Sequence, residues 1–152
     1  MTKSQKIVTL CAASFLAGAP AFAHHSIVYF DRTQIIEGEG EVTEVYWGNP
    51  HIRFTVSGAD ARSVPQIWEI ETSSVRTAGR FGLTEGLITT GTRVRIAGNP
   101  SSVLENRVLL TNILLPDGRE LLFGVGERYQ SRWPGQRIGE DASGDIGLTD
   151  SF

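Results

Sequence analysis

The stretch that most constrains the fold is residues 38–56, GEGEVTEVYWGNPHIRFTV, in which two alternating segments flank a turn. The four residues WGNP between them are turn chemistry, because proline fixes one φ angle while glycine and asparagine tolerate positive φ. From Ile52 to Val56 apolar residues alternate with polar ones, which is the period of a half-buried strand. The stretch therefore predicts a long β-hairpin.

The chain up to residue 123 predicts further short strands and one helix. Alternation or apolar runs predict strands at residues 35–47, 51–56, 66–71, 93–97, 107–115 and 120–123. Ser73 or Ser74 predicts the N-cap of a short helix that runs to about Arg80, and Gly38 and Gly40 predict a bulge or bend. This order predicts an all-β fold with one short helix: a small five- to six-stranded OB-like barrel with the helix between strands three and four. Another small open barrel or sandwich is the alternative.

Residues 1–23 have the pattern of a cleavable secretory signal peptide. Two lysines precede an apolar run at residues 7–19, and an Ala-x-Ala site ends at Ala23. The run is shorter than the roughly 20 residues of a membrane-spanning helix, although a retained anchor is the alternative. We expect a periplasmic or secreted chain, free of the membrane, with a β-barrel domain and N-terminal arm at residues 24–123. A polar, Gly-rich tail at residues 124–152 is expected to be loosely ordered.

The charge of the expected mature chain argues against nucleic acid as a partner. Lys3 and Lys6 are the only lysines and lie in the signal, which leaves twelve arginines against 17 Asp and Glu residues. Binding to nucleic acid or anionic membranes relies on positive charge, so we expect neither. Cleavage also removes Cys11 and Met1, the only cysteine and methionine, and with them any thiolate or soft metal ligand.

Four short motifs in a fixed order resemble a known family. They are HHS at residues 24–26, WGNPH at 47–51, GTRV at 91–94 and LPDGR at 115–119. Together they resemble the domain of unknown function 6152 family of small exported bacterial proteins, over roughly residues 24–123. The chain departs from the family in its longer polar tail and at residues 27–29, where small residues are more usual. The resemblance supports the fold and export, and it implies no activity.

The three histidines form the first candidate site. Cleavage after Ala23 gives His24 a free amine beside its imidazole, and the two can chelate one metal ion as a histidine brace. His25 or His51 would supply a third nitrogen, and Asp31 a carboxylate ligand or a hydrogen-bonding partner. Such nitrogen ligands favour Cu(II) first and Zn(II) second, which makes copper the one candidate cofactor. The alternative is that these histidines hold no metal and His51 only caps a turn or lies on a solvated strand face.

The second candidate site is an outward ligand face of the barrel. Its residues are Trp47, Arg53, Trp68, Arg93 and Arg95. Aromatic stacking and arginine forks hold sugars, nucleotides or carboxylates. The alternative is that the tryptophans belong to the core and the arginines pair with glutamates across strands, which is ordinary sheet stabilisation.

The sequence offers little support for an enzyme. It has no Gly-x-Ser-x-Gly elbow, and no phosphate-binding glycine loop opens a helix. Glu69 and Glu71 share one strand face, as acid–base pairs do, but a solvated face explains them better. We therefore expect a non-enzymatic periplasmic protein that binds a metal ion or small ligand. The alternative is an interaction module that recruits a partner protein through the barrel face or the arm at Tyr29 and Phe30.

Overall fold

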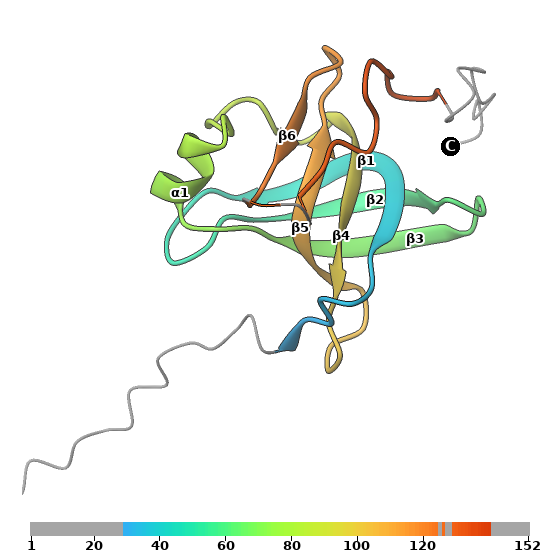
Figure 1. Cartoon of the computed structure of the whole chain (residues 1–152), viewed down its shortest axis with the longest axis horizontal. Coiled ribbons are helices and arrows are strands. Elements are labelled where there is room, and N and C mark those ends of the chain that lie inside the picture. The colour runs from blue at the N-terminus through green and yellow to red at the C-terminus, as the bar shows by residue number, and fades with distance from the viewer. Residues whose placement is uncertain (1–28, 125, 127–128, 141–152) are drawn as a thin grey trace, which may run out of the picture.

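The computed structural model describes residues 29–124, 126 and 129–140, and it contains six strands and one short helix (Figure 1). None of the helices in these ranges is long and apolar enough to cross a membrane. In chain order the elements are β1 (Ile36–Tyr46), β2 (Arg53–Asp60), β3 (Pro65–Glu71), α1 (Val75–Arg80), β4 (Arg93–Pro100), β5 (Arg107–Leu114) and β6 (Glu120–Leu122).

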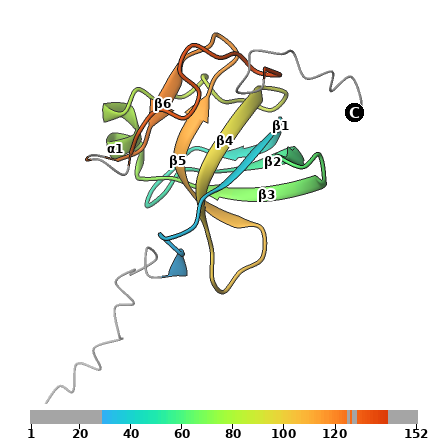
Figure 2. The same cartoon turned by 45° about the vertical axis from the view of Figure 1, so that its right-hand side comes forward.

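The strands form a closed barrel. They follow the order β3-β2-β1-β4-β5-β6, and a parallel pairing of β3 with β5 closes the first five into a ring while β6 extends β5. The helix α1 connects β3 to β4 and lies at one end, whereas the β4–β5 connection projects from another (Figure 2). The predicted all-β, OB-like barrel, with its helix between strands three and four, is confirmed.

The predicted hairpin is formed by β1 and β2, which pair antiparallel from Gly38 with Asp60 to Tyr46 with Arg53. Its register shift lies between Val42 and Glu44, and β1 is strongly bent (Figure 1).

Two glycines allow the backbones of β1 and β2 to approach closely. A Cβ atom on Gly40 would lie 2.3 Å from the carbonyl oxygen of Ser57, and one on Gly58 only 2.0 Å from that of Glu39. Side chains at these positions would therefore force the strands apart.

The core fills the barrel from the faces that alternation predicted. Ile52, Phe54 and Val56 are buried, and Trp68 is buried beside them. A Cβ atom on Gly38 would lie 2.2 Å from the Trp68 ring, so the missing side chain makes room for the indole.

Part of the tail packs against the barrel. Trp133 is buried and packs on Ala97 and Leu114, and the carboxylate of Glu120 accepts hydrogen bonds from the backbone N–H groups of Arg132 and Trp133. The sequence pattern predicted a loosely ordered tail, whereas between residues 129 and 140 the chain makes these defined contacts. The remaining tail, residues 141–152, and the expected signal peptide lie outside the described residues.

We predict that Gly58→Ala destabilises the barrel by about 1 to 3 kcal/mol, because the new methyl group collides with the backbone of β1. Chemical denaturation measures the change. Gly79→Ala is the matched control: nothing lies within 4 Å of a Cβ atom there, and in a helix the change is expected to stabilise by about 0.5 to 1 kcal/mol. Equal stability of the Gly58→Ala variant and the unchanged chain would contradict the close approach.

We also predict that acid releases the tail. Burial raises the pKa of Glu120, but hydrogen bonds from Ser131, Arg132, Asn112 and Trp133 outweigh it and hold the pKa below the ordinary 4.5. Because docking lowers the pKa of Glu120, the ionised carboxylate stabilises the docked tail at pH values above the ordinary pKa of 4.5. This stabilisation is lost as the pH falls through the lowered pKa of the folded state. Hydrogen exchange at the amides of Arg132 and Trp133 should accelerate there beyond its intrinsic pH dependence. Glu120→Gln should show the faster exchange already at neutral pH, and unchanged protection in that variant would refute the role of the carboxylate.

Candidate functional site

His51 is held against a buried carboxylate. Its Nδ1 atom lies 2.6 Å from Oε1 of Glu71, whose side chain is 9% exposed, whereas that of His51 is 31% exposed. The next residue, Ile52, donates from its backbone to Ser73 and accepts from the backbone of Thr72, so the chain is tied down immediately after the histidine. Nε2 is therefore the ring nitrogen of His51 left for a ligand.

In the described part of the chain, no other predicted metal ligand lies beside His51. His24 and His25 lie outside the ranges described. Asp31 lies on the arm, where its carboxylate accepts hydrogen bonds from Thr33 and Gln34, and the bonds from Thr33 and Gln34 lower its pKa despite some desolvation. Within residues 29–124, 126 and 129–140, no three His, Cys, Asp or Glu side chains gather as a metal site requires. The brace at His24 stays a prediction.

The five residues of the predicted ligand face take separate positions. Trp68 is buried in the core, and Trp47 is half-buried and packs against it. Arg53 is exposed and lies over the ring of Tyr46, with 4.9 Å from its Cζ atom to the ring centroid.

The two remaining arginines bind one carboxylate across the β1–β4 ladder. Arg93 and Arg95 lie 3.2 and 2.9 Å from the two oxygens of Glu39. Arg95 also donates to the side chain of Gln136 and lies over the ring of Trp133. Arg93 and Arg95 therefore form cross-strand ion pairs, and Arg95 also contacts the tail.

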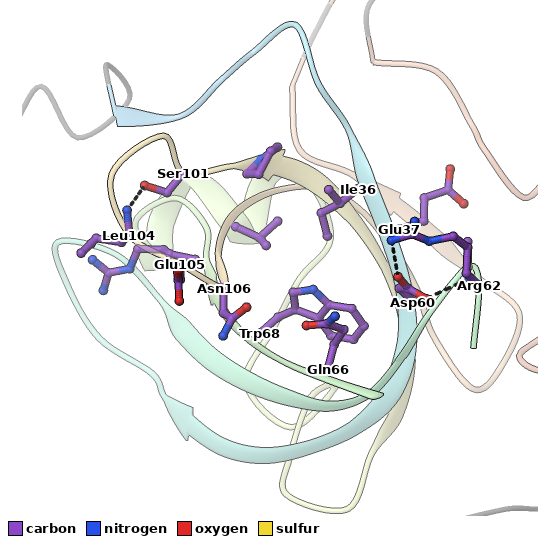
Figure 3. A pocket seen from close by; sticks show the side chains of 14 residues that line it. Ile36, Glu37, Asp60, Arg62, Gln66, Trp68, Ser101, Leu104, Glu105 and Asn106 are labelled. Atoms are coloured by element: carbon purple, nitrogen blue, oxygen red, sulfur yellow. Dashed lines mark hydrogen bonds and ion pairs between the residues drawn. The ribbon is translucent and has the colours of Figure 1, made fainter. Parts of the chain in front are cut away.

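A cavity of about 400 Å³ opens between the β2–β3 and β4–β5 connections. Figure 3 shows the indole of Trp68 in its centre, with Gln66 beside it and residues 104–106 along one wall. Asp60 and Arg62 lie at the opposite wall (Figure 3). Ile36 and Val108 add further apolar surface to the lining.

Most charges around this cavity are paired. Asp60 lies 3.3 Å from Arg62, Arg107 lies 3.6 Å from Glu69, and Glu37 bonds to Arg132 of the tail. In the described part of the chain, the indole N–H of Trp68 has no hydrogen-bond acceptor, and the side chains of three other polar or charged lining residues make no hydrogen bond or ion pair. These are Gln66, Glu105 and Asn106. The cavity thus offers an apolar floor, two neutral amides and one unpaired carboxylate.

Exposed apolar side chains concentrate around this opening. Among the described residues, six of the seven large exposed ones lie on the arm, the β2–β3 side or the β4–β5 connection, and Tyr46 is the seventh. The six are Tyr29, Ile35, Val64, Ile67, Val103 and Leu104. The arm belongs to the same end, because the carbonyl of Tyr29 accepts hydrogen bonds from Ser101 and Ser102. We call this surface, with the cavity that it surrounds, the cavity end of the barrel.

Sequence reasoning missed the cavity end because its parts are far apart in the chain. The sequence predicted strands that end at residues 56 and 97, whereas the structure extends β2 to Asp60 and β4 to Pro100. One local signal was present: Val103 and Leu104 are adjacent apolar residues inside an otherwise polar connection.

No curated protein matches the sequence of this chain. One solved structure that matches part of the chain is the mitochondrial single-stranded DNA binding protein Rim1 from S. cerevisiae. It is 11% identical, with a TM-score of 0.41, and the match covers 54% of this chain and 92% of that chain. The model of the Family of unknown function (DUF6152) matches residues 13–107, which is more than half of the 152 residues. The chain therefore belongs to this family, as its motifs predicted.

Proposed function

We propose that the chain is exported to the periplasm and acts there as a non-enzymatic binding module that holds a partner protein at its cavity end. The observation that carries the proposal is the concentration of exposed apolar side chains around the cavity. Exposed apolar side chains gathered at one end of a domain favour an interaction site, because burial of apolar surface is worth about 25 cal/mol per Å².

Two features favour a protein over a small molecule or a substrate. Tyr29, Ile67 and Val103 lie outside the cavity lining, so a partner that covers them must extend beyond the cavity itself. Most charged groups of the lining are held in ion pairs, and acid–base catalysis needs such groups free to exchange protons with a substrate.

We predict that a photo-crosslinking amino acid at position 104 captures a periplasmic partner, because Leu104 is exposed at the rim. Tyr46 is the matched control: it is exposed to a similar degree but lies on β1, away from the cavity end. After irradiation of whole cells, the variant at position 104 should give a discrete higher-mass adduct and the variant at position 46 should not. Absence of an adduct, or equal adducts at both positions, would count against this surface.

A second candidate function is Cu(II) binding, with Zn(II) as the weaker choice, and the His51–Glu71 pair favours it. Ligating histidines usually bond their other ring nitrogen to a carboxylate, which orients the ring and raises its basicity. Glu71 plays this part for Nδ1 of His51 and leaves Nε2 for the metal. His24 and His25 would supply the remaining nitrogens, and Asp31 a carboxylate.

The reach of the arm limits which histidine completes such a site. Tyr29 is fixed beside β4, and β5 separates β4 from β3, whose last residue is Glu71. The path from the arm to β4, from β4 to β5 and from β5 to β3 crosses three strand spacings, which amount to roughly 14 Å. The five residues from His24 to Tyr29 span at most about 17 Å. A site that includes His51 therefore requires the arm to run nearly straight across β4 and β5, and His25 is the less demanding third ligand.

We predict that Cu(II) titrated into protein that starts at His24 gives a one-to-one complex in isothermal calorimetry. His24→Ala should weaken it strongly, because the change removes the imidazole that chelates the metal together with the terminal amine. His51→Ala separates the two geometries: an affinity loss of about tenfold or more assigns His51 as a ligand, and no loss assigns His25. Undiminished affinity in His24→Ala would exclude the brace.

A further inference from the structure

We propose that the partner binds by adding a strand to the open edge of β3 at residues 65–68 and by placing one apolar side chain over Trp68. The ligand class is an extended polypeptide segment, apolar at alternate positions and free of acidic residues. This inference rests on the proposed function and adds the mode of recognition. Other folds bind peptides in this way, with an open strand edge that pairs with the peptide backbone and an adjoining pocket that takes a side chain.

The open edge follows from the barrel pairing. β3 pairs with β2 along its whole length, from Pro65 to Glu71, but it pairs with β5 only from Glu69 onward. The N–H of Glu69 points to the β5 side, where it donates to the carbonyl of Asn106 over 2.9 Å. Because backbone groups alternate along a strand, the N–H and C=O of Ile67 point to that side too, where the described chain places no strand. Such unpaired groups are a template for another strand.

The edge borders the cavity. Gln66 and Trp68 form one wall, and residues 104–108 form the facing wall, so a segment laid between them would run along β3 (Figure 3). Side chains of a strand point alternately to its two faces. One side chain of the added segment would therefore face Trp68, while its backbone meets Ile67. The unpaired amides of Gln66 and Asn106 line the same cavity and can bond to the backbone of the segment.

The lining also sets the charge of the segment. A charge placed on the apolar floor would lose its hydration without a partner, since Asp60, Arg62 and Arg107 at the walls are already in ion pairs. Glu105 is exposed and unpaired among the described residues, so it repels an acidic segment and attracts a lysine or arginine at the mouth.

Pro65 limits the positions at which an added strand can bond to the edge of β3. It has no N–H, so Ile67 supplies the backbone donor of this edge. The side chain of Ile67 is 58% exposed and is therefore available to the partner rather than needed by the core.

The test begins with a library of random nonapeptides displayed on phage and selected on the immobilised protein, residues 24–152. Enriched peptides should alternate apolar residues and lack Asp and Glu, and their affinity is then measured by calorimetry with synthetic copies. Ile67→Pro should weaken binding about five- to tenfold, the worth of a backbone hydrogen bond. A single N-methyl group on alternate peptide residues should have a similar effect.

Matched variants separate this mode from the proposed function. Ile67→Val keeps the N–H and should bind as the unchanged chain does, with circular dichroism confirming that all variants fold. Binding that depends on Leu104, tested with Leu104→Asp, but tolerates Ile67→Pro would overturn strand addition and leave the partner surface intact. If the selection yields no peptide whose binding is weakened by Leu104→Asp, both strand addition and the proposed partner surface are overturned. Self-association of the chain in ultracentrifugation, abolished by Ile67→Pro, would assign the edge to a second copy and also refute the proposal.

Discussion

The barrel depends on the short parallel contact between β3 and β5, which joins only Glu69, Ile70 and Glu71 to Arg107, Val108 and Leu109. Without it the strands would form an open, twisted sheet with two exposed edges. Because the contact involves the last residues of β3, the barrel closes near His51, whose ring contacts the carboxylate of Glu71. The first half of β3 is left without a partner on that side, and the cavity lies in the gap. One pairing therefore places both candidate sites.

Closure also decides which charged groups remain for function. On β1 and β4, Glu39 binds both Arg93 and Arg95, and the tail lies over Arg95 through Trp133. That side of the barrel is occupied by the protein itself, so its arginines stabilise the fold and are not offered to a ligand. The cavity end is different, because the groups left unpaired there are exposed apolar side chains, two neutral amides and the carboxylate of Glu105.

Local alternation was enough to predict the barrel and its inward faces, but not the site. Ile52 to Val56 could be assigned because apolar and polar residues alternate there without exception. Ile67 and Trp68 are both apolar, so alternation could not say which one faces the core, and Trp68 was placed on a ligand face although it packs where Gly38 leaves room. The alternative that the arginines pair with glutamates across strands is confirmed for Arg95 and Glu39, but alternation could not name this partner, because the two residues lie 56 apart in sequence. Trp133 is isolated from other large apolar residues in the sequence, and its burial depends on packing against Ala97, Leu114 and Ile138.

The arm is anchored beside the cavity. Phe30 is buried and bridges Ser101, and the carbonyl of Tyr29 accepts from Ser101 and Ser102. The hydroxyl of Ser101 in turn accepts from the backbone of Leu104, which lies in the cavity wall. A metal ion held at His24 would restrict the arm five residues before this anchor, and a strand added beside Ile67 would press on the same connection from its other side. Ligands at the two sites would therefore act on one connection, so the presence of either should alter the affinity for the other.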